Sequence, residues 1–228
     1  VVIEGVLLAR QELGVEIVLV GPPDVIAAEL GKHPGAPQIA IAPASQVVPM
    51  QESPSIALRK KDSSMRVAFE LMKRGEADAV VSAGNSGAMM ALGMFVMGTL
   101  SQVARPAILV VVPSLGKGTV IVDAGANVDC KPKHLLHFGL MGSIYAESVL
   151  GVTKPRVGVL SNGEEASKGT ELTRAASALL GATPLNYIGY VEGRDIFNDK
   201  VDVVVCDGFT GNVALKTMEG VASFAGEI

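Results

Sequence analysis

Short runs of aliphatic residues, apolar at every position, constrain this chain most. Val120–Val122, Val157–Leu160 and Val203–Val205 contain no alternating polar residue. A strand with one face in water alternates apolar and polar side chains, whereas a strand of a parallel sheet is covered on both faces and reads as a continuous apolar run. Amphipathic segments lie between these runs. We therefore expect an α/β domain with three layers and a mostly parallel, Rossmann-like sheet.

The same pattern predicts where each element lies. Residues 107–112 and 119–123 are expected to pair as an antiparallel hairpin across the short connection at 114–118. The other strands are expected at 15–20, 38–42, 77–82, 156–161, 187–191 and 201–206. Helices are expected at 1–13, 24–32, 62–74, 87–99, 133–150, 170–180 and 212–228, with 43–61 irregular.

Composition excludes several classes of protein. Apolar residues make up 49% of the chain and charged residues 18%, which is too apolar for a disordered protein. No apolar run approaches the length of about 20 residues that a membrane-spanning helix needs. The net charge of −4 argues against general nucleic-acid binding. Two cysteines and no apparent signal peptide favour a reducing, cytoplasmic setting.

The organisation predicted is one α/β domain over residues 1–228. An α/β domain normally begins with a strand, but the first predicted element here is the helix at 1–13, so we expect a strand to precede Val1. The last helical pattern reaches Ile228 without a cap. We expect the chain to be part of a longer protein.

Four polar, glycine-containing clusters follow predicted strands. In open α/β sheets, ligands bind at the carboxyl ends of the strands, and N–H groups at helix starts bind anions. Each cluster alone is also what a turn and a helix N-cap require. Four clusters at one edge favour a binding site. They are Ser82–Ala88, Asp123–Asp129, Ser161–Gly169 and Cys206–Asn212.

Other kinds of site find little support in the sequence. The Walker A, dinucleotide-binding GxGxxG, GxSxG and HExxH patterns do not occur. His134 and His137 lie three apart on one predicted helix, and we assign them a packing or surface role rather than metal binding. Cys130 lies in a polar loop and Cys206 ends an apolar strand, but neither has a neighbouring histidine to activate it. We expect no metal and no cofactor.

Taken together, these motifs resemble the PlsX family of bacterial phosphate acyltransferases. The matching segments run in order through nearly the whole chain: Lys60–Ser64, Ser82–Ala88, Asp123–Asp129, Asn162–Gly169, Val191–Asp195 and Cys206–Asn212. The family's N-terminal strand with its Asp-Ala-Met-Gly-Gly-Asp motif, and its C-terminal helical region, are absent from these residues. The resemblance implies the α/β fold shared with phosphotransacetylases and isocitrate-dehydrogenase-like enzymes.

The resemblance also implies a reaction and its partners. A long-chain acyl group would pass from acyl carrier protein to inorganic phosphate, giving acyl phosphate for phospholipid synthesis. Family members are homodimers that associate peripherally with the cytoplasmic face of the membrane. The downstream glycerol-3-phosphate acyltransferase is a further partner that this implies.

Phosphate is already a charged nucleophile, so we expect direct attack on the thioester without an acyl-enzyme. Lys168 is the predicted cation for phosphate or the oxyanion, with Asn162 and Asp129 beside it in catalysis. Acids would repel phosphate, so they are expected to orient donors or to accept a proton. Neutral donors and these acids make up the predicted substrate site: Asn85, Ser86, Asp123, Asn127, Asp207 and Asn212.

An acidic carrier needs a local basic patch on an acidic enzyme. Arg59, Lys60 and Lys61 are expected to be exposed and to provide it, with Lys131 and Lys133 as further candidates. Two other functions stay open. One is a short-chain phosphotransacetylase that acts on coenzyme A thioesters, and the other is a non-catalytic module that binds an anion or a carrier.

Overall fold

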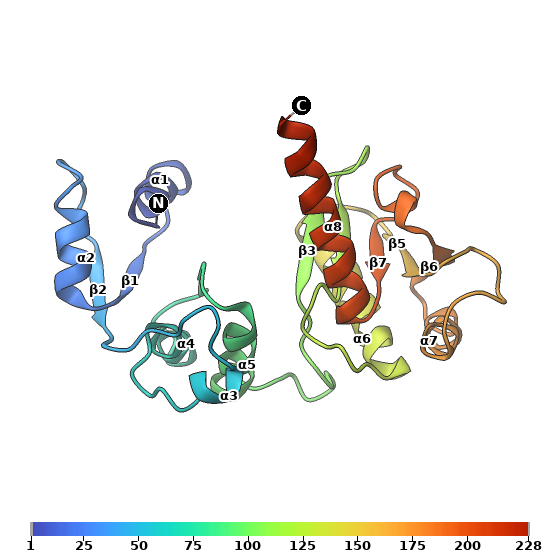
Figure 1. Cartoon of the computed structure of the whole chain (residues 1–228), viewed down its shortest axis with the longest axis horizontal. Coiled ribbons are helices and arrows are strands. Elements are labelled where there is room, and N and C mark those ends of the chain that lie inside the picture. The colour runs from blue at the N-terminus through green and yellow to red at the C-terminus, as the bar shows by residue number, and fades with distance from the viewer. Residues whose placement is uncertain (1, 228) are drawn as a thin grey trace. The chain divides into compact units, whose positions relative to one another are not determined.

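The computed structural model describes residues 2–227. The chain divides into two compact units, Val1–Thr99 and Leu100–Ile228. Figure 1 draws the first unit in blue to green and the second in green to red. The single domain expected over residues 1–228 stays a prediction.

The first unit begins with a small α/β layer. Helix α1 (Val2–Leu13) and helix α2 (Pro23–Leu30) accompany strands β1 (Val18–Gly21) and β2 (Ala40–Pro43). The two strands pair in parallel, with Val18 opposite Ala40. Ile3, Leu19 and Ile39 form the buried core of this layer. All four elements were predicted, with ends that differ by a few residues.

Three helices complete the first unit: α3 (Pro54–Ala57), α4 (Ser64–Lys73) and α5 (Ser86–Val96). The start of α4 follows the sequence prediction, because the Ser63 hydroxyl oxygen accepts a hydrogen bond from the Arg66 N–H. The short α3 lies in the stretch predicted to be irregular. Its sequence holds Pro54, which fits the first turn of a helix since its missing N–H needs no partner there.

The strand predicted at 77–82 is wrong. This segment forms no strand, and Val81 is 96% exposed. A strand is stable only when a neighbour pairs with its N–H and C=O groups, and no strand of the described chain pairs with this segment. The sequence around Val80 and Val81 is apolar like a strand, but no neighbouring strand pairs with it, so no strand forms.

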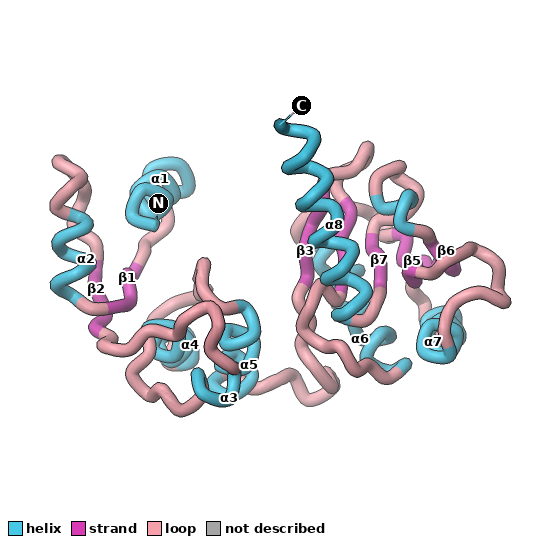
Figure 2. Tube along the Cα trace, in the orientation of Figure 1, coloured by secondary structure: helices cyan, strands magenta, loops and turns pink. Residues whose placement is uncertain are grey.

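The second unit contains the larger sheet. Its strands are β3 (Leu109–Val112), β4 (Thr119–Val122), β5 (Arg156–Leu160), β6 (Asn186–Val191) and β7 (Val203–Val205), in the order β3-β4-β7-β5-β6. The β3–β4 pair is antiparallel, which confirms the predicted hairpin. The pairs β4–β7, β7–β5 and β5–β6 are parallel. Figure 2 shows these strands in magenta.

Both faces of this sheet are covered. Helices α6 (Pro132–Ser148) and α7 (Glu171–Gly181) pack on one face, where Leu135, Phe138 and Leu180 are fully buried. The other face is covered by the segment at 193–202, which includes the short helix η1 (Gly193–Ile196), and by Met218 of helix α8 (Gly208–Glu227). The α/β class with a mostly parallel sheet is thereby confirmed.

Helix α8 begins four residues earlier than the predicted Asn212. The Asp207 carboxylate accepts hydrogen bonds from the N–H and the hydroxyl of Thr210, at 2.9 and 2.8 Å, and so caps a helix that starts at Gly208. The two glycines at 208 and 211 concealed this start, because glycine has a low helix propensity. Within residues 2–227, no helix is both long enough and apolar enough to cross a lipid bilayer.

Candidate functional site

Three of the four predicted clusters lie at one edge of the larger sheet. They follow β4, β7 and β5, which are neighbours and run in parallel, so their carboxyl ends face the same side. The fourth cluster, Ser82–Ala88, belongs to the first unit and follows no strand. The prediction of one common edge is therefore right for three clusters. The fourth cluster was predicted to follow a strand, and that prediction is wrong.

The loop at 123–129, after β4, is organised around a buried carboxylate. Asp123 is 0% exposed and accepts five hydrogen bonds. One carboxylate oxygen receives the N–H groups of Ile108, Gly125 and Ala126, and the other receives the backbone N–H and the side-chain amide of Asn127. Asp123 thus holds the loop in shape, while its predicted role of orienting donors toward phosphate stays a prediction.

Asn127 is the second residue whose side chain stabilises this loop by hydrogen bonds. Its side-chain amide donates to the Asp123 carboxylate and to the Pro106 carbonyl, both at 2.8 Å, and the side chain is buried. Both N–H bonds of the amide are therefore engaged within the protein. Asp129, at the end of the loop, is exposed, and no side-chain hydrogen bond joins it to residues 2–227. Of the two carboxylates in this loop, Asp129 is therefore the exposed one and Asp123 the buried one.

The start of α8 rests directly on the 123–129 loop. The Gly208 N–H donates to the Asn127 carbonyl at 2.7 Å. A Cβ on Gly211 would collide with the Asp123 carbonyl oxygen, so the helix approaches this closely only because residue 211 is glycine. Asn212 follows, exposed, with its amide nitrogen 3.5 Å from the Ala124 carbonyl. An amide donor is thereby placed at the edge of the sheet.

The loop at 161–169, after β5, carries Lys168. The Asn162 side-chain oxygen accepts the Gly169 N–H at 3.0 Å across this loop, and the Lys168 N–H donates to the Glu165 carbonyl at 2.9 Å. The aliphatic part of Lys168 lies against Gly163, where a Cβ would be 2.9 Å from the Lys168 Cγ. No carboxylate within residues 2–227 forms an ion pair with the Lys168 ammonium group. It is a half-buried cation without an internal partner.

Asn85 and Ser86 lie at the start of α5 in the first unit. The Asn85 amide donates to three carbonyl groups, those of Pro49, Met50 and Glu52, and its side-chain oxygen caps the helix at the Ala88 N–H. Asn85 is buried and Ser86 is exposed. Whether these two residues share a site with the loops of the second unit stays a prediction.

The basic stretch at 59–61 is exposed only in part. Arg59 and Lys61 are exposed, as predicted. For Lys60 the prediction is wrong, since its side chain is 25% exposed and pairs with the Glu52 carboxylate, itself 11% exposed. The Lys60 ammonium also donates to the Val47 carbonyl at 2.8 Å. A buried carboxylate nearby requires a cation, so Lys60 stabilises the first unit instead of facing a partner.

Neither cysteine has the environment of a nucleophile. Burial raises the pKa of the Cys130 thiol to about 11, although a backbone hydrogen bond at Gly208 acts in the opposite direction. Burial also raises the pKa of Cys206 well above its ordinary range. At neutral pH both groups are thiols, and a thiol is a poor nucleophile compared with its thiolate. His134 and His137 each accept a backbone N–H through Nδ1, from Lys131 and Ala104.

We predict that the double variant Cys130→Ser and Cys206→Ala keeps whatever acyl-transfer activity the wild type shows, the activity expected from the sequence. It should lose about 1–2 kcal/mol in free energy of unfolding, the cost of disturbed packing. The measurements are acyl phosphate formation by the variant and mass spectrometry of the wild-type protein mixed with donor in the absence of phosphate. A folded but inactive variant, or an acyl group trapped on Cys130, would show that a thiol takes part.

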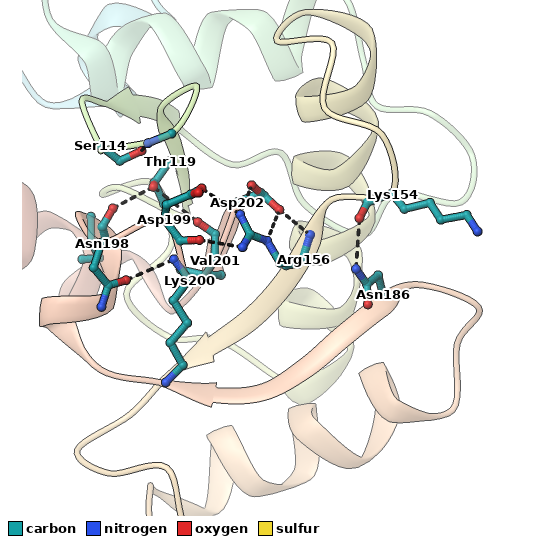
Figure 3. A network of polar contacts seen from close by, with 12 residues as sticks. Ser114, Thr119, Lys154, Arg156, Asn186, Asn198, Asp199, Lys200, Val201 and Asp202 are labelled. Atoms are coloured by element: carbon teal, nitrogen blue, oxygen red, sulfur yellow. Dashed lines mark hydrogen bonds and ion pairs between the residues drawn. The ribbon is translucent and has the colours of Figure 1, made fainter.

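A polar network that the sequence analysis missed lies at the opposite edge of the sheet (Figure 3). Arg156, at the start of β5, donates to both carboxylate oxygens of Asp202 at 2.8 and 2.9 Å and to the Asp199 carboxylate at 2.9 Å. The Thr119 hydroxyl donates to the Ile196 carbonyl at 2.7 Å. Arg156 and Asp202 begin or precede strands, so this network ties the amino ends of β5 and β7 together.

The network makes stability depend on pH in a defined direction. Burial alone would raise the pKa of Asp202, but hydrogen bonds from Arg156 outweigh it and lower this pKa below its usual range. The resulting stabilisation is complete above the unfolded-state pKa of about 3.9 and is lost as the pH falls through the lower pKa of the folded protein. We predict that Asp202→Asn lowers the free energy of unfolding by about 2 kcal/mol at pH 7.

The difference between this variant and the wild type should begin to shrink below a pH of about 4, where the wild-type carboxylate becomes protonated in the unfolded state, and should vanish once the pH is below the lower pKa of the folded protein. Denaturant unfolding at several pH values measures this difference in free energy of unfolding. Asp199→Asn is the matched control, because the Asp199 side chain is 54% exposed and its pair with Arg156 is screened by water, and we expect it to lose less than about 1 kcal/mol. A difference that stays constant down to pH 2 would contradict the assignment.

Comparison with known proteins gives consistent results. A family model described as "Fatty acid synthesis protein" matches residues 1–228. A protein of Geobacter sp. (strain M21) named "Phosphate acyltransferase" is 58% identical over 228 residues, which cover 99% of this chain and 65% of the relative. A Geobacter sulfurreducens protein of the same name is 56% identical, over 99% of this chain and 66% of the relative. The chain spans about two thirds of the length of these relatives.

Solved structures resemble the fold at low sequence identity. A phosphotransacetylase from Streptococcus pyogenes superposes with a TM-score of 0.58 at 14% identity, over 91% of this chain and 82% of the other. The EutD phosphotransacetylase from Staphylococcus aureus gives a TM-score of 0.56, also at 14% identity, over 91% and 83%. At this identity the likeness concerns the fold, and it confirms the phosphotransacetylase-like architecture expected from the sequence.

Proposed function

Because the chain belongs to the family of fatty acid synthesis proteins that includes the PlsX-type phosphate acyltransferases, we propose that it transfers a long-chain acyl group from acyl carrier protein to inorganic phosphate. The observation that carries this proposal is Lys168, a half-buried residue whose ammonium group has no ion-pair partner within residues 2–227 and which lies in a loop at the carboxyl edge of the sheet. A cation in that position suits an anionic substrate.

In the proposed reaction, a phosphate oxygen attacks the carbonyl carbon of the thioester. A C–O bond forms, the C–S bond breaks, and the carrier leaves with its thiol sulfur, which takes up a proton. Lys168 would neutralise phosphate or the developing oxyanion, and the Asn212 amide would donate a hydrogen bond to it. Positioning of the reactants can supply about 7–11 kcal/mol, so the enzyme needs no nucleophile of its own.

The other predicted residues take supporting roles in this proposal. Asp129 is exposed and would accept the proton or orient a donor. Asn162 holds the ends of the 161–169 loop together through the Gly169 N–H. Asp207 caps α8, while Asp123 and Asn127 hold the 123–129 loop. Three of the residues predicted to bind substrate would therefore act by shaping the site.

Two rival functions differ in their products. A short-chain phosphotransacetylase would form acetyl phosphate from acetyl-CoA, and a binding module would form no product. The experiment is to incubate the full-length protein with labelled phosphate and either a long-chain acyl carrier protein or acetyl-CoA. We expect labelled long-chain acyl phosphate and free carrier from the first donor. Faster turnover of acetyl-CoA, or no product from either donor, would contradict the proposal.

For the acidic carrier we propose a basic contact at Arg59 and Lys61, which are exposed and have no ion-pair partner within residues 2–227. The double variant Arg59→Glu and Lys61→Glu should raise the KM for the acyl carrier by about three- to tenfold at low salt, because opposite charges attract the partner. Its KM should also depend less on salt, since fewer charges remain to be screened.

Steady-state kinetics at low and high salt measure both effects. Lys73→Glu combined with Lys154→Glu is the matched control, which makes the same change in net charge at two exposed lysines that also have no ion-pair partner within residues 2–227. An unchanged KM for the carrier at both salt concentrations would exclude Arg59 and Lys61 as a contact.

The homodimer, the peripheral contact with the cytoplasmic face of the membrane and the contact with the downstream glycerol-3-phosphate acyltransferase are proposals too. Helix α8 supports an interface of some kind, because it exposes Phe209, Val213, Val221 and Phe224. Sedimentation of the full-length protein, flotation with anionic lipid vesicles and co-purification with the acyltransferase test the three partners. A monomer that neither floats nor co-purifies would contradict them.

A further inference from the structure

Lys200 connects the 161–169 loop to the segment that covers the sheet. Its ammonium group donates to the Glu164 carboxylate at 2.6 Å and to the Asp195 carboxylate at 3.2 Å. Its backbone N–H donates to the Asn198 side-chain oxygen at 3.1 Å. Figure 3 shows Lys200 beside Asn198, with its side chain extending away from the Arg156 network. The sequence analysis assigned no role to Lys200, and none to Glu164 beyond its place in the 161–169 cluster.

Lys200 thus bridges Glu164 and Asp195, and the Asp195 end of this bridge is fixed. The Asp195 side chain is 3% exposed and also accepts the Glu192 N–H at 2.9 Å and the Asn198 amide at 3.0 Å. Burial would raise the pKa of Asp195, but these hydrogen bonds and Lys200 outweigh it and lower the pKa. A buried carboxylate held from three sides leaves Lys200 little freedom, in contrast to a pair of two exposed side chains.

The outer end of the bridge lies in the loop that carries Lys168. Glu164 precedes Lys168 by four residues, and the ends of the loop are joined by Asn162 and the Gly169 N–H. The Arg174 guanidinium also donates to the Gly169 carbonyl at 2.7 Å. These contacts fix the beginning and the end of the loop. The Glu164–Lys200 pair is an ion pair that ties its middle to another part of the fold.

We propose that Lys200 is a positioning residue, which acts through Glu164 to hold the Lys168 loop in the geometry that binds phosphate. Lys200 does not touch the substrate in this proposal. The inference rests on the proposed function, because it assigns a role toward Lys168. A displacement of a catalytic group by about 1 Å can cost up to about a hundredfold in rate, so a tie of this kind has a measurable effect.

A double-mutant cycle in the full-length protein tests the proposal. Lys200→Met should lower kcat/KM for phosphate about tenfold in the wild-type background. In the Lys168→Ala background it should have almost no further effect, since the group that it positions is gone. Lys200→Arg should restore most of the activity. Hydrogen exchange of the 161–169 backbone should be faster in Lys200→Met.

Matched variants separate this role from a general loss of stability. Lys216→Met breaks a pair of the same length, 2.6 Å to Glu219 on the surface of α8, and should leave kinetics and loop exchange unchanged. Glu164→Gln removes only the outer end of the bridge and leaves Lys200 on Asp195. It should reproduce the tenfold loss even where Lys200→Met fails to fold.

The outcomes distinguish the two proposals. If Lys168→Ala alone is fully active, the proposed role of Lys168 fails. If Lys168→Ala is impaired and Lys200→Met costs the same factor in both backgrounds, the site stands and the positioning role is overturned. Faster loop exchange without loss of activity in Glu164→Gln overturns it as well.

Discussion

Replacing Lys168 by alanine is expected to lower kcat/KM for phosphate by at least tenfold and by as much as about a thousandfold. A preorganised group that stabilises a developing oxyanion contributes about 3–4 kcal/mol, and Lys168 is a half-buried cation of the site loops without an internal partner in the described part of the chain. Since its ammonium group forms no ion pair within residues 2–227, its removal leaves no buried carboxylate unpaired. Circular dichroism should therefore show a native fold.

The control is Lys154→Ala, a lysine that precedes β5 at the opposite edge of the sheet (Figure 3). Its activity should equal that of the wild type. Initial rates over a range of phosphate concentrations provide the measurement for both variants. Near-normal turnover of Lys168→Ala at saturating phosphate, with a normal KM, would remove Lys168 from the site.

Replacing Asp123 by asparagine is expected to lower the free energy of unfolding by about 3–5 kcal/mol. Five N–H donors converge on the two carboxylate oxygens of this fully buried side chain. Asparagine offers one oxygen and one NH₂ group, so two or three of these donors would face another donor. Hydrogen bonds to a charged acceptor contribute about 1.5–3 kcal/mol each, and a buried group left without a partner costs more.

Denaturant unfolding measures this loss, and Asp129→Asn is the matched control in the same loop. Asp129 is exposed and its side chain forms no hydrogen bond within residues 2–227. The free energy of unfolding of Asp129→Asn should therefore differ from that of the wild type by less than about 0.5 kcal/mol. Equal stability of the Asp123 and Asp129 variants would mean that the buried carboxylate does not organise the loop.

Much of the larger sheet follows from local pattern. The apolar runs at 120–122, 157–160 and 203–205 became buried neighbouring strands, and Ser63 and Thr170 cap helices close to where the sequence predicted them. The edge of the candidate site was predictable for the same reason. Once strands are parallel, the loops after them must meet on one side.

The strand runs, the helix starts and the residue types at the site edge follow from the order of the residues, because these features depend on neighbours along the chain. Which polar side chains are engaged internally and which face outward follows from the three-dimensional fold alone. Asp123 and Lys60 were predicted as site residues. In the fold, Asp123 is buried and accepts hydrogen bonds from its own loop and from the Ile108 N–H, and Lys60 is paired with the buried Glu52 carboxylate. Lys200 gave no local signal, since Glu164 is 36 residues away. A charged group is free or engaged according to what the fold brings within about 3 Å of it, and that distance is not written in local sequence.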